Sequence, residues 1–416
     1  MNERADVLVI GGGAVGACAA YYLVRAGLSV TLVEKGELAS GCSGANAGLI
    51  VPSHSVPMAN PRTRRLAFKG LFHPQSPLRI RVRPDFDLLL WLWRFHRSCS
   101  AQKMRAGMGA LCKLNHASLK LWKDLIKNEN LACGFQQKGW LIVYKKEKAF
   151  REALEDRELL QSYGIKAEIF DGRKTLDFCP FLLPEISGGV FYPEDAHLDP
   201  ARFVSALAER LRDLGVTIYP QTEVRSFEST NSKLTVVRTN RGDFRPENVV
   251  LAAGAWSSSL AKKIGMNLPL QPAKGYVIST RLPDNFPSFP LYLSEAKVAI
   301  TPLEDSLRIA GALEFEGMDF KVRKKGVSRI LNFSQDYLKQ TGSHDILAVS
   351  SGLRPCTPDG LPFISRHPEL PNLIVATGHG MLGITLAPVT GKLVSQIVRD
   401  EAPCVDLNPF RLFRFC

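Results

Sequence analysis

The amino-acid sequence predicts an α/β protein that is organised around its N-terminal segment. Residues 7–10 form a short apolar run that is typical of a buried strand, and residues 30–33 form a second one. Between them lie a glycine-rich turn at residues 11–16 and an alanine-rich segment with helical character at residues 17–25. Near the other end of the chain, residues 372–398 repeat the order of apolar run, glycine-rich turn and helix. Strands that alternate with helices in this way favour a parallel sheet covered by helices.

The glycines of the first turn suit a Rossmann-like unit that binds a nucleotide. Gly11 lets the strand turn sharply, Gly13 lets a pyrophosphate approach the backbone, and Gly16 lets the helix pack closely on the strand. Ala14 and Val15 lie where the free N–H groups and the positive dipole end of the helix face the phosphates. The turn therefore predicts a phosphate site.

Glu34 and the run that follows it help to decide which nucleotide binds. The carboxylate of Glu34 ends the second strand, where it is placed to accept hydrogen bonds from a ribose diol, and Lys35 comes next. Residues 41–50 form a small, polar, glycine-rich run, which suits backbone lying against a flat and extended ligand. The nucleotide could be NAD or FAD, and an NAD enzyme has no need of this second run.

The composition is that of an ordinary globular protein of 416 residues, with 45% hydrophobic and 22% charged residues. This length allows a large core and two domains. The nine cysteines are odd in number and have no metal-type spacing, so we expect free thiols in a reducing, cytoplasmic setting and no metal site. No signal peptide is convincing, and the uncharged run at residues 7–24 contains the phosphate turn, so we expect no membrane-spanning segment.

The net charge of +13 is concentrated in one part of the chain. Residues 62–105 contain eleven Lys or Arg residues and two acidic ones. Within this stretch, residues 86–95 are strongly apolar, too short to span a membrane, and helical in character. Either this helix packs into the protein core, or it lies peripherally in the cytoplasmic face of the inner membrane with Trp91 and Trp93 at the headgroups. No nucleic-acid motif accompanies the charge, so we expect no nucleic-acid partner.

The remaining chain alternates between helical and extended patterns. We expect helices at residues 103–130, 147–163 and 200–214, and strands at residues 139–144, 188–193, 216–219, 249–256, 274–279, 298–301 and 307–311. Residues 222–246 alternate like an antiparallel meander, residues 52–84 read as an irregular connection, and residues 321–326 read as a solvated basic turn. Asp199 is a good helix start, and we interpret His197 as a loop and cap residue rather than a metal ligand.

Several motifs together carry a resemblance to a known family. They are the run at residues 34–48, VVLAAGAW at residues 249–256, KGY at residues 274–276, GLRPCTPDGLP at residues 352–362 and TGHGMLGIT at residues 377–385. On these motifs the sequence resembles the FAD-dependent amine oxidoreductases of the D-amino-acid oxidase (DAO) superfamily. Within it, the sequence is similar to the bacterial D-amino acid dehydrogenase group, which is linked to quinones or dyes and related to glycine oxidase and D-hydroxyproline dehydrogenase.

The resemblance implies a Rossmann-like FAD-binding domain of the GR2/DAO type with an inserted α+β substrate domain. The FAD-binding domain would comprise residues 1–85, 196–264 and 346–416, and the substrate domain residues 86–195 and 265–345. FAD would be held non-covalently. The residues implied to bind it are Gly11, Gly13, Ala14, Val15, Gly16, Glu34, Lys35, Ser43, Asn46, Ala47, Gly48, Leu49, Val224, Ala253, Gly254, Trp256, Gly380, Met381, Leu382, Gly383, Ile384 and Thr385.

The resemblance also implies three residues near the reacting atoms. Arg354 would bind the substrate carboxylate, because a bidentate guanidinium orients the Cα–H toward flavin N5. His379 would border the flavin edge, either as an acid/base or as a support of the turn. Tyr276 would line the pocket or be an ordinary strand residue. The helix that follows residues 378–385 would direct N–H groups at the flavin N1–C2 carbonyl edge and stabilise the reduced form.

The implied reaction is hydride transfer to FAD from the Cα of a D-amino acid whose amine is neutral. The imino acid then hydrolyses to a 2-oxo acid and ammonia, and the electrons pass to a quinone or another acceptor. Oxygen as the acceptor would make the protein an oxidase. The sequence leaves open a D-hydroxyproline or proline dehydrogenase, a glycine or sarcosine oxidase, and a non-enzymatic FAD-binding subunit of a larger complex.

Overall fold

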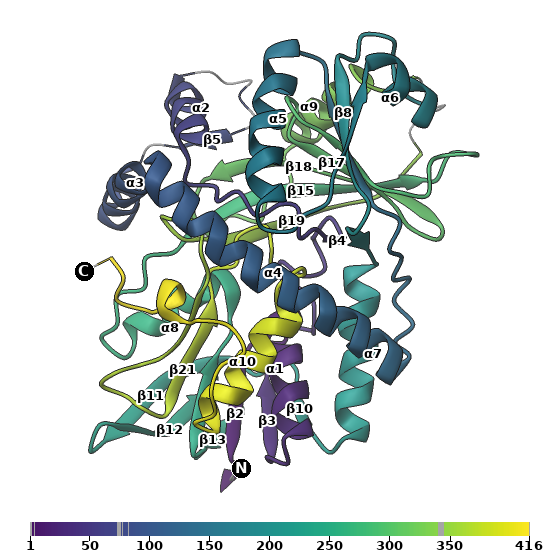
Figure 1. The fold of residues 1–416 in the computed structure, drawn as a ribbon. Coiled ribbons are helices and arrows are strands. Elements are labelled where there is room, and N and C mark those ends of the chain that lie inside the picture. Colours follow the sequence, from purple (N-terminus) through teal and green to yellow (C-terminus); the bar gives the residue numbers. More distant parts are fainter. Residues whose placement is uncertain are drawn as a thin grey trace.

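The computed structural model of the protein describes residues 2–3, 5–72, 76, 78–81, 83–339 and 345–415. The lower half of the molecule in Figure 1 is built around a six-stranded sheet, and the upper half around a nine-stranded sheet. Helix α4 (Ala101–Glu129) crosses both halves. Met108 of α4 packs in one cluster with Tyr144 of the upper half, and the Trp122 ring lies tilted against that of Phe203 of the lower half, with centroids 4.5 Å apart.

The six-stranded sheet carries the predicted phosphate turn. Its order is β10-β3-β2-β14-β21-β20, and neighbours are parallel except for the last pair. The strands are β2 (Val7–Ile10), β3 (Val30–Val33), β10 (Thr217–Tyr219), β14 (Asn248–Leu251), β20 (Phe363–Arg366) and β21 (Leu373–Thr377). Along β2, Val7 and Val9 face one core cluster while Leu8 and Ile10 face another, so both faces of the sheet are covered.

Three helices cover one face of this sheet and a small, mainly antiparallel sheet covers the other. The helices are α1 (Ala14–Arg25), α7 (Pro200–Asp213) and α10 (Ala387–Val398). The antiparallel strands of the small sheet are β11 (Val224–Thr230), β12 (Lys233–Thr239) and β13 (Gly242–Phe244), and β1 (Asn2–Glu3) pairs with β13 in parallel. The meander predicted for residues 222–246 is therefore confirmed, as are the strands predicted at residues 7–10, 30–33 and 216–219 and the helix predicted at residues 200–214. The strand predicted at residues 249–256 is too long, because β14 ends at Leu251 and Gly254–Trp256 form a 3-10 helix. Helices α1 and α10 pack closely, since a Cβ on Gly391 would lie 2.5 Å from the Cys18 carbonyl oxygen.

The nine-stranded sheet forms the upper half. Its order is β19-β15-β18-β17-β16-β6-β8-β7, with β5 paired to β18. The strands are β5 (Leu78–Ile80), β6 (Trp140–Tyr144), β7 (Glu168–Asp171), β8 (Gly188–Tyr192), β15 (Gln271–Arg281), β16 (Leu291–Leu293), β17 (Val298–Pro302), β18 (Ser306–Phe315) and β19 (Ile346–Cys356). Helices α5 (Glu147–Gln161), α6 (Gly172–Phe178) and α9 (Lys324–Gln335) lie in this half.

Two segments lie in a different sheet from the one that the predicted domain boundaries assign to them. Strand β19 pairs with β15 over most of its length, so residues 346–356 belong to the upper sheet and not to the predicted segment 346–416. Strand β5 pairs with β18, so residues 78–80 also leave the predicted segment 1–85. The physical reason is that strand partners are set by tertiary packing, which neither segment reveals by its own pattern.

Some connecting segments are more regular than the sequence predicts. Residues 52–84 contain β5 and helix α2 (Pro61–Phe72), and the basic turn predicted at residues 321–326 is wrong because α9 begins at Lys324. The short elements are β4 (Leu49–Ile50), β9 (Ala196–His197), η1 (Gly254–Trp256), α8 (Ser257–Lys262) and η2 (Asn408–Phe410). Asp199 caps α7 as predicted, accepting hydrogen bonds from the amides of Ala201 and Arg202. Within the described ranges the cysteines are free thiols.

The apolar segment at residues 86–95 forms helix α3 (Phe86–Ser98), which has one buried and one exposed face. The buried face includes Trp91, whose indole N–H donates to the Cys356 carbonyl at 2.9 Å and whose ring stacks on Phe95. The exposed apolar face, named here the α3 apolar face, consists of Phe86, Leu89 and Trp93, which are 53–77% exposed. Core packing is therefore confirmed for Trp91, whereas Trp93 faces solvent.

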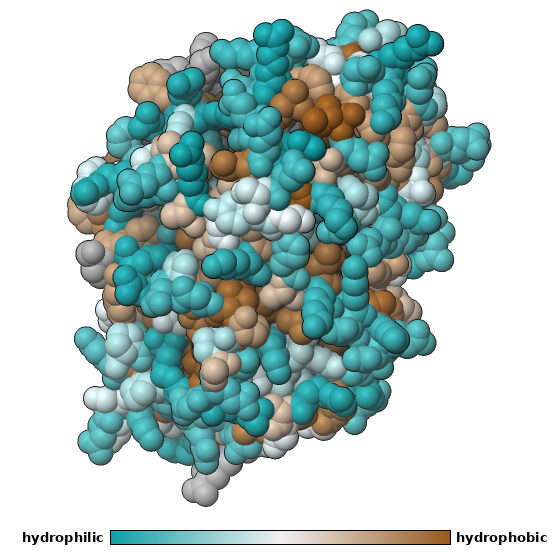
Figure 2. All heavy atoms as spheres, in the orientation of Figure 1, coloured by the Kyte–Doolittle hydropathy of each residue, from teal (hydrophilic) through white to brown (hydrophobic). Residues whose placement is uncertain are grey.

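The surface of the protein is mainly hydrophilic in the view of Figure 2, and its apolar side chains lie in scattered groups. Among the helices of the described ranges, none combines the length and the apolar character that crossing a bilayer requires.

Trp91→Ala should lower the free energy of unfolding by about 3–5 kcal/mol, the usual cost of removing a buried aromatic side chain. Trp93→Ala is the matched control on the same helix, and it should change that free energy by about 0.5 kcal/mol or less because its side chain is exposed. Urea unfolding followed by circular dichroism measures both values. Equal losses in the two variants would contradict the buried role of Trp91.

Candidate active site

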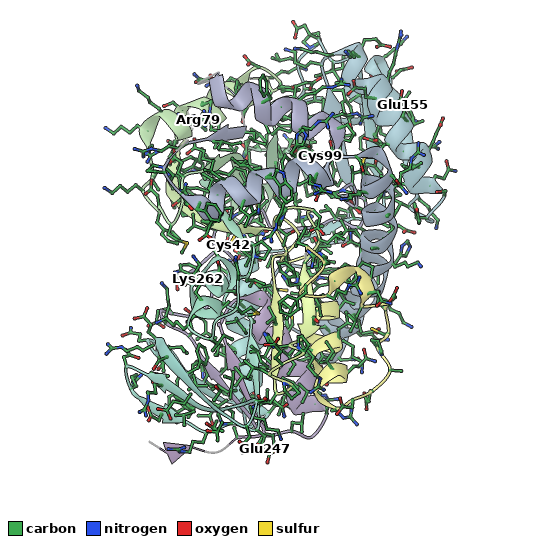
Figure 3. The ribbon with its side chains drawn as sticks, turned by 90° about the vertical axis from the view of Figure 1, so that its left-hand side faces the viewer. Cys42, Arg79, Cys99, Glu155, Glu247 and Lys262 are labelled. Atoms are coloured by element: carbon green, nitrogen blue, oxygen red, sulfur yellow. The ribbon has the colours of Figure 1, made fainter. Side chains whose placement is uncertain are left out.

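A cleft of about 410 Å³ opens at the carboxyl ends of the parallel strands. Its lining includes Ile10 at the end of β2, Glu34 after β3, Ala253 after β14 and Thr377 at the end of β21. This edge is where open α/β sheets bind their ligands. Cys42, which also lines the cleft, lies at the level where the two halves of the molecule meet in Figure 3.

The glycine-rich turn at one side of this cleft has the geometry of a phosphate site. Gly11 has a φ of +118°, and a Cβ there would lie 2.5 Å from the Ala252 carbonyl oxygen. A Cβ on Gly16 would lie 1.8 Å from the Gly11 carbonyl oxygen, so only glycine lets α1 pack this closely. Gly13 is the N-cap of α1 and supplies no side-chain cap, while the Ala14 amide donates to the Ser43 hydroxyl at 3.0 Å. The positive end of the α1 dipole therefore lies at the cleft, where it suits a phosphate.

Glu34 is held rigidly beside the turn. Its carboxylate accepts hydrogen bonds from the Gly12 amide at 2.7 Å and the Gly36 amide at 3.0 Å. A carboxylate has about four acceptor sites, so these two bonds leave capacity for a ribose diol. Next to it, the Lys35 ammonium lies 4.2 Å from the centroid of the Trp256 ring.

Most of the predicted cofactor-binding residues line the cleft. Those that do are Gly11, Gly13, Ala14, Val15, Glu34, Lys35, Ser43, Asn46, Val224, Ala253, Gly254, Trp256, Gly380, Gly383 and Ile384. Those outside the lining are Gly16, Ala47, Gly48, Leu49, Met381, Leu382 and Thr385. Thr385 instead ties two segments together: its hydroxyl donates to the Leu49 carbonyl and accepts from the Val51 amide.

The cleft also contains residues that sequence patterns did not indicate. Arg225, Lys263 and Phe320 line it, and each comes from a segment without a recognisable motif. Arg308 of β18 supports it from behind, donating to the Gly44 carbonyl at 2.6 Å. These residues reach the cleft only through the pairing of distant segments, so the sequence held no local signal for them.

Arg354 lies on β19 with its guanidinium over Gly275 of β15. A Cβ on Gly275 would lie 2.0 Å from Nη1, so the glycine of the KGY motif makes the space for this side chain. Nη1 donates a hydrogen bond to the Ala312 carbonyl at 2.9 Å. Within the described ranges the guanidinium makes no second hydrogen bond. Arg354 borders the cleft without forming part of its lining.

The charge of Arg354 acts on groups that surround it. Burial raises the pKa of the Cys42 thiol, and Arg354 offsets part of this rise. Burial likewise raises the pKa of Cys356 to about 12 and that of Tyr292 to about 12, again against the effect of Arg354. The charge of the guanidinium therefore reaches Cys42 of the cleft as well as Tyr292 of the upper sheet.

A second, smaller cavity of about 30 Å³ adjoins the cleft. Its lining includes His54, Met58, Leu111 and Cys356, and it shares His379 and Gly380 with the cleft; the predicted residues Met381 and Leu382 also line it. Burial lowers the pKa of His54 to about 4. The cavity is therefore apolar and uncharged in character.

The other two predicted catalytic residues do not act as charged groups in the cleft. Nε2 of His379 lies 2.9 Å from the Thr390 hydroxyl, and burial lowers the pKa of His379 to about 3, so the ring is neutral and supports the turn. Tyr276 is fully buried, and its hydroxyl donates to Glu314 at 2.8 Å. It projects from the opposite strand face to Gly275 and is not part of the cleft lining, which fits the alternative that Tyr276 is an ordinary strand residue.

Comparison with known proteins identifies the family. A family model described as FAD dependent oxidoreductase (DAO) matches residues 6–397. The chain belongs to the DAO family. A D-amino acid dehydrogenase from Vibrio atlanticus is 31% identical over 99% of this chain and 100% of its own length, and one from Methylobacterium radiotolerans is 31% identical over 98% and 99%.

Solved structures of the DAO family have the same fold. A glycine oxidase from Geobacillus kaustophilus has a TM-score of 0.81 with 25% identity and full coverage of both chains. An L-proline dehydrogenase from P. horikoshii has a TM-score of 0.77 with 20% identity over 100% of this chain and 98% of its own. This DAO-family protein is thus an FAD-dependent oxidoreductase, and the phosphate turn, the N-terminus of α1 and Glu34 fit the diphosphate and ribose of FAD.

The buried His379 generates a prediction about stability in acid. Because its pKa falls from 6.5 to about 3 on folding, the unfolded chain binds more protons between these values. The contribution of His379 to the free energy of unfolding is therefore fully present above pH 6.5 and decreases as the pH falls. At pH 4 the decrease amounts to about 3 kcal/mol. His379→Gln should flatten the fall in unfolding free energy between pH 7 and pH 4.

His116→Gln is the matched control, since His116 is exposed and should leave this slope unchanged. Denaturant unfolding at a series of pH values gives the slope. A slope in His379→Gln equal to that of the wild type would show that His379 is not held neutral by burial.

Proposed function

We propose that this DAO-family enzyme catalyses the FAD-dependent oxidative deamination of D-amino acids to 2-oxo acids and ammonia. The observation that carries the proposal is the placement of the Arg354 guanidinium over Gly275, beside the cofactor cleft. The D-amino acid dehydrogenases that match nearly the whole chain support the same reaction.

In the proposed reaction, Arg354 binds the α-carboxylate of the substrate through two parallel hydrogen bonds. This fixes the amino acid so that its Cα–H faces the cleft. When bound there, FAD supplies the acceptor for the hydride that leaves the Cα. The neutral His379 provides no strong base, so the substrate reacts as the free amine, and its lone pair forms the C=N bond. Water then hydrolyses the protonated imine to the 2-oxo acid and ammonia, which leaves as ammonium.

The full-length likeness to a glycine oxidase favours one alternative, a small amine such as glycine or sarcosine as the substrate. Anaerobic reduction of the bound FAD by a panel of D-amino acids, L-amino acids, glycine, sarcosine and D-hydroxyproline separates the candidates. Fastest bleaching of the flavin absorbance by D-amino acids supports the proposal, and fastest bleaching by glycine or sarcosine replaces it with the alternative.

Arg354→Lys should lower kcat/KM for the best substrate by an amount equal to about 2–4 kcal/mol, because lysine cannot form the bidentate contact with a carboxylate. The FAD content, read from the ratio of flavin to protein absorbance, should stay the same. Arg281→Lys is a matched control in the same sheet, since Arg281 is exposed on β15. A kcat/KM in Arg354→Lys close to that of the control would refute the role of Arg354.

The electron acceptor is proposed to be a membrane quinone. The α3 apolar face carries Trp93, and the Arg97 guanidinium lies 4.9 Å from the centroid of its ring. The neighbouring helix α2 adds the exposed residues Arg64 and Arg65. Arginines around exposed aromatic side chains suit peripheral contact with anionic lipid, each basic residue near the surface contributing about 1 kcal/mol.

Leu89→Ala with Trp93→Ala should weaken binding to vesicles of phosphatidylglycerol and slow the reduction of a quinone held in those vesicles. Reduction of a water-soluble dye should be unchanged, because the cofactor cleft is untouched. Ile169→Ala, an exposed apolar position on β7, is the control. Wild-type protein that ignores the vesicles would contradict the membrane contact, and peroxide formation as fast as quinone reduction would make the enzyme an oxidase.

A further inference from the structure

The loop at residues 316–323, which connects β18 to α9, reaches from the upper half to the cofactor cleft. Its Phe320 stacks on Trp256 of the lower half, with ring centroids 5.4 Å apart and an interplanar angle of 15°. Both rings line the cleft. Next to Trp256, a Cβ on Gly41 would lie 3.4 Å from its ring, so this stack covers the run that begins at residue 41. The loop therefore meets the lower half at the mouth of the FAD cleft.

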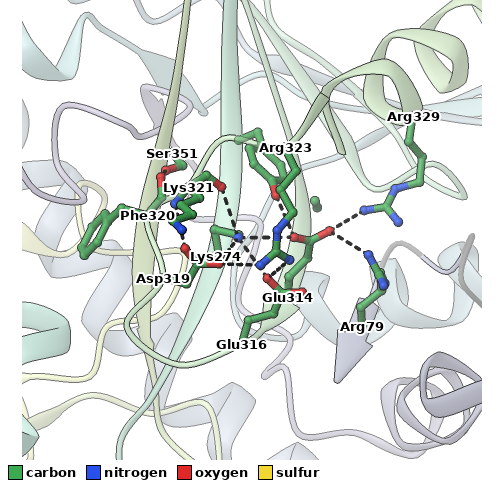
Figure 4. A network of polar contacts seen from close by, with 12 residues as sticks. Arg79, Lys274, Glu314, Glu316, Asp319, Phe320, Lys321, Arg323, Arg329 and Ser351 are labelled. Atoms are coloured by element: carbon green, nitrogen blue, oxygen red, sulfur yellow. Dashed lines mark hydrogen bonds and ion pairs between the residues drawn. The ribbon is translucent and has the colours of Figure 1, made fainter. Parts of the chain in front are cut away.

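A fully buried lysine lies behind this loop. Lys274 of β15 is 0% exposed, and its ammonium contacts Glu316 at 3.0 Å, Asp319 at 3.1 Å and the Lys321 carbonyl at 3.3 Å (Figure 4). All three of these partners belong to the 316–323 loop. One side chain of β15 thus fixes the loop at three points.

Further charges complete the network in Figure 4. Arg323 pairs with Glu316 and with Asp319, and so closes the loop on itself. Burial raises the pKa of Glu316, but Lys274 and Arg323 outweigh this effect and hold it below its ordinary value. The carboxylate therefore stays charged in the folded protein.

The network is anchored to the sheet at its other end. Glu314 of β18 accepts from the Tyr276 hydroxyl at 2.8 Å and from Arg329 at 2.7 Å, and lies 3.9 Å from Lys274. On the loop's other side, the Ser351 hydroxyl of β19 donates to the Phe320 carbonyl at 2.6 Å. The residues on either side of Phe320 are therefore held from β15, and its own carbonyl is held from β19.

A buried ion network of this kind adds little net stability, because removing the charges from water offsets much of their attraction. The network instead holds the groups that it joins in a single defined position, and these groups belong to the loop that carries Phe320. A role in fold stability alone would not require the contacts to converge on this loop.

We propose that Lys274 is a positioning residue whose ion network holds Phe320 against Trp256, so that the 316–323 loop clamps FAD in its cleft. The clamp acts on the cofactor and not on the substrate, so it does not rest on the proposed reaction. It predicts that the rate at which FAD leaves the holoenzyme depends on Lys274 and on Phe320 through the same contact.

The experiment measures FAD dissociation from the holoenzyme by the rise of flavin fluorescence after dilution. Lys274→Met, which keeps the length of the side chain, should raise the dissociation rate roughly tenfold, as should Phe320→Ala, on the scale of one lost aromatic pair. The double variant should be no faster than the faster single variant, because both changes remove one contact. Lys321→Met, an exposed lysine of the same loop, is the matched control and should release FAD like the wild type.

Urea unfolding of each variant separates clamping from general stability. If Lys274→Met folds and releases FAD at the wild-type rate, the proposal is overturned. It is also overturned if the increases in dissociation rate caused by Lys274→Met and by Phe320→Ala multiply in the double variant. If Lys274→Met fails to fold, Arg323→Gln at the exposed edge of the network decides. Faster FAD release in Arg323→Gln supports the clamp, and an unchanged rate overturns it.

Discussion

The antiparallel pairing of β15 with β19 determines which side chains reach the cofactor and which do not. Its register sets Gly275 opposite Gly352 and Ala273 opposite Arg354, so the guanidinium lies over Gly275 on one face of the sheet. Lys274 projects from the other face into the ion network. Because a slip by one residue exchanges the two faces of a strand, the same register fixes both the arginine and the clamp.

The nucleotide half could be predicted closely because its determinants are local. Gly11, Gly16 and Glu34 act within one strand-turn-helix-strand unit, and the roles assigned to the glycines from sequence agree with the contacts that a Cβ would make. The upper half was less predictable. Tyr276 shows why: alternation along a strand separates two faces, but the strand alone does not reveal which face meets the cleft.

Long-range partners account for the rest of what the sequence did not reveal. Phe320 lies in no motif, and its place in the cleft depends on Trp256 of η1 in the lower half. Trp91 and Trp93 lie two residues apart on α3, and one is buried while the other is exposed. The helical period predicts that they lie on different faces of the helix, but it does not say which face meets the core. His379 was assigned to the correct turn, yet its neutral state comes from burial that only the packed structure defines.

The cofactor cleft lies on the seam between the halves, and this couples FAD binding to their association. Phe320 and Pro355 of the upper half and Gly11 of the lower half line the same cleft, while Arg308 of the upper sheet holds the Gly44 carbonyl. A ligand that binds only the assembled cleft stabilises the folded chain by RT ln(1 + [L]/Kd). FAD therefore adds to the packing between the halves, and each contact that keeps the halves in register in turn tightens the hold on FAD.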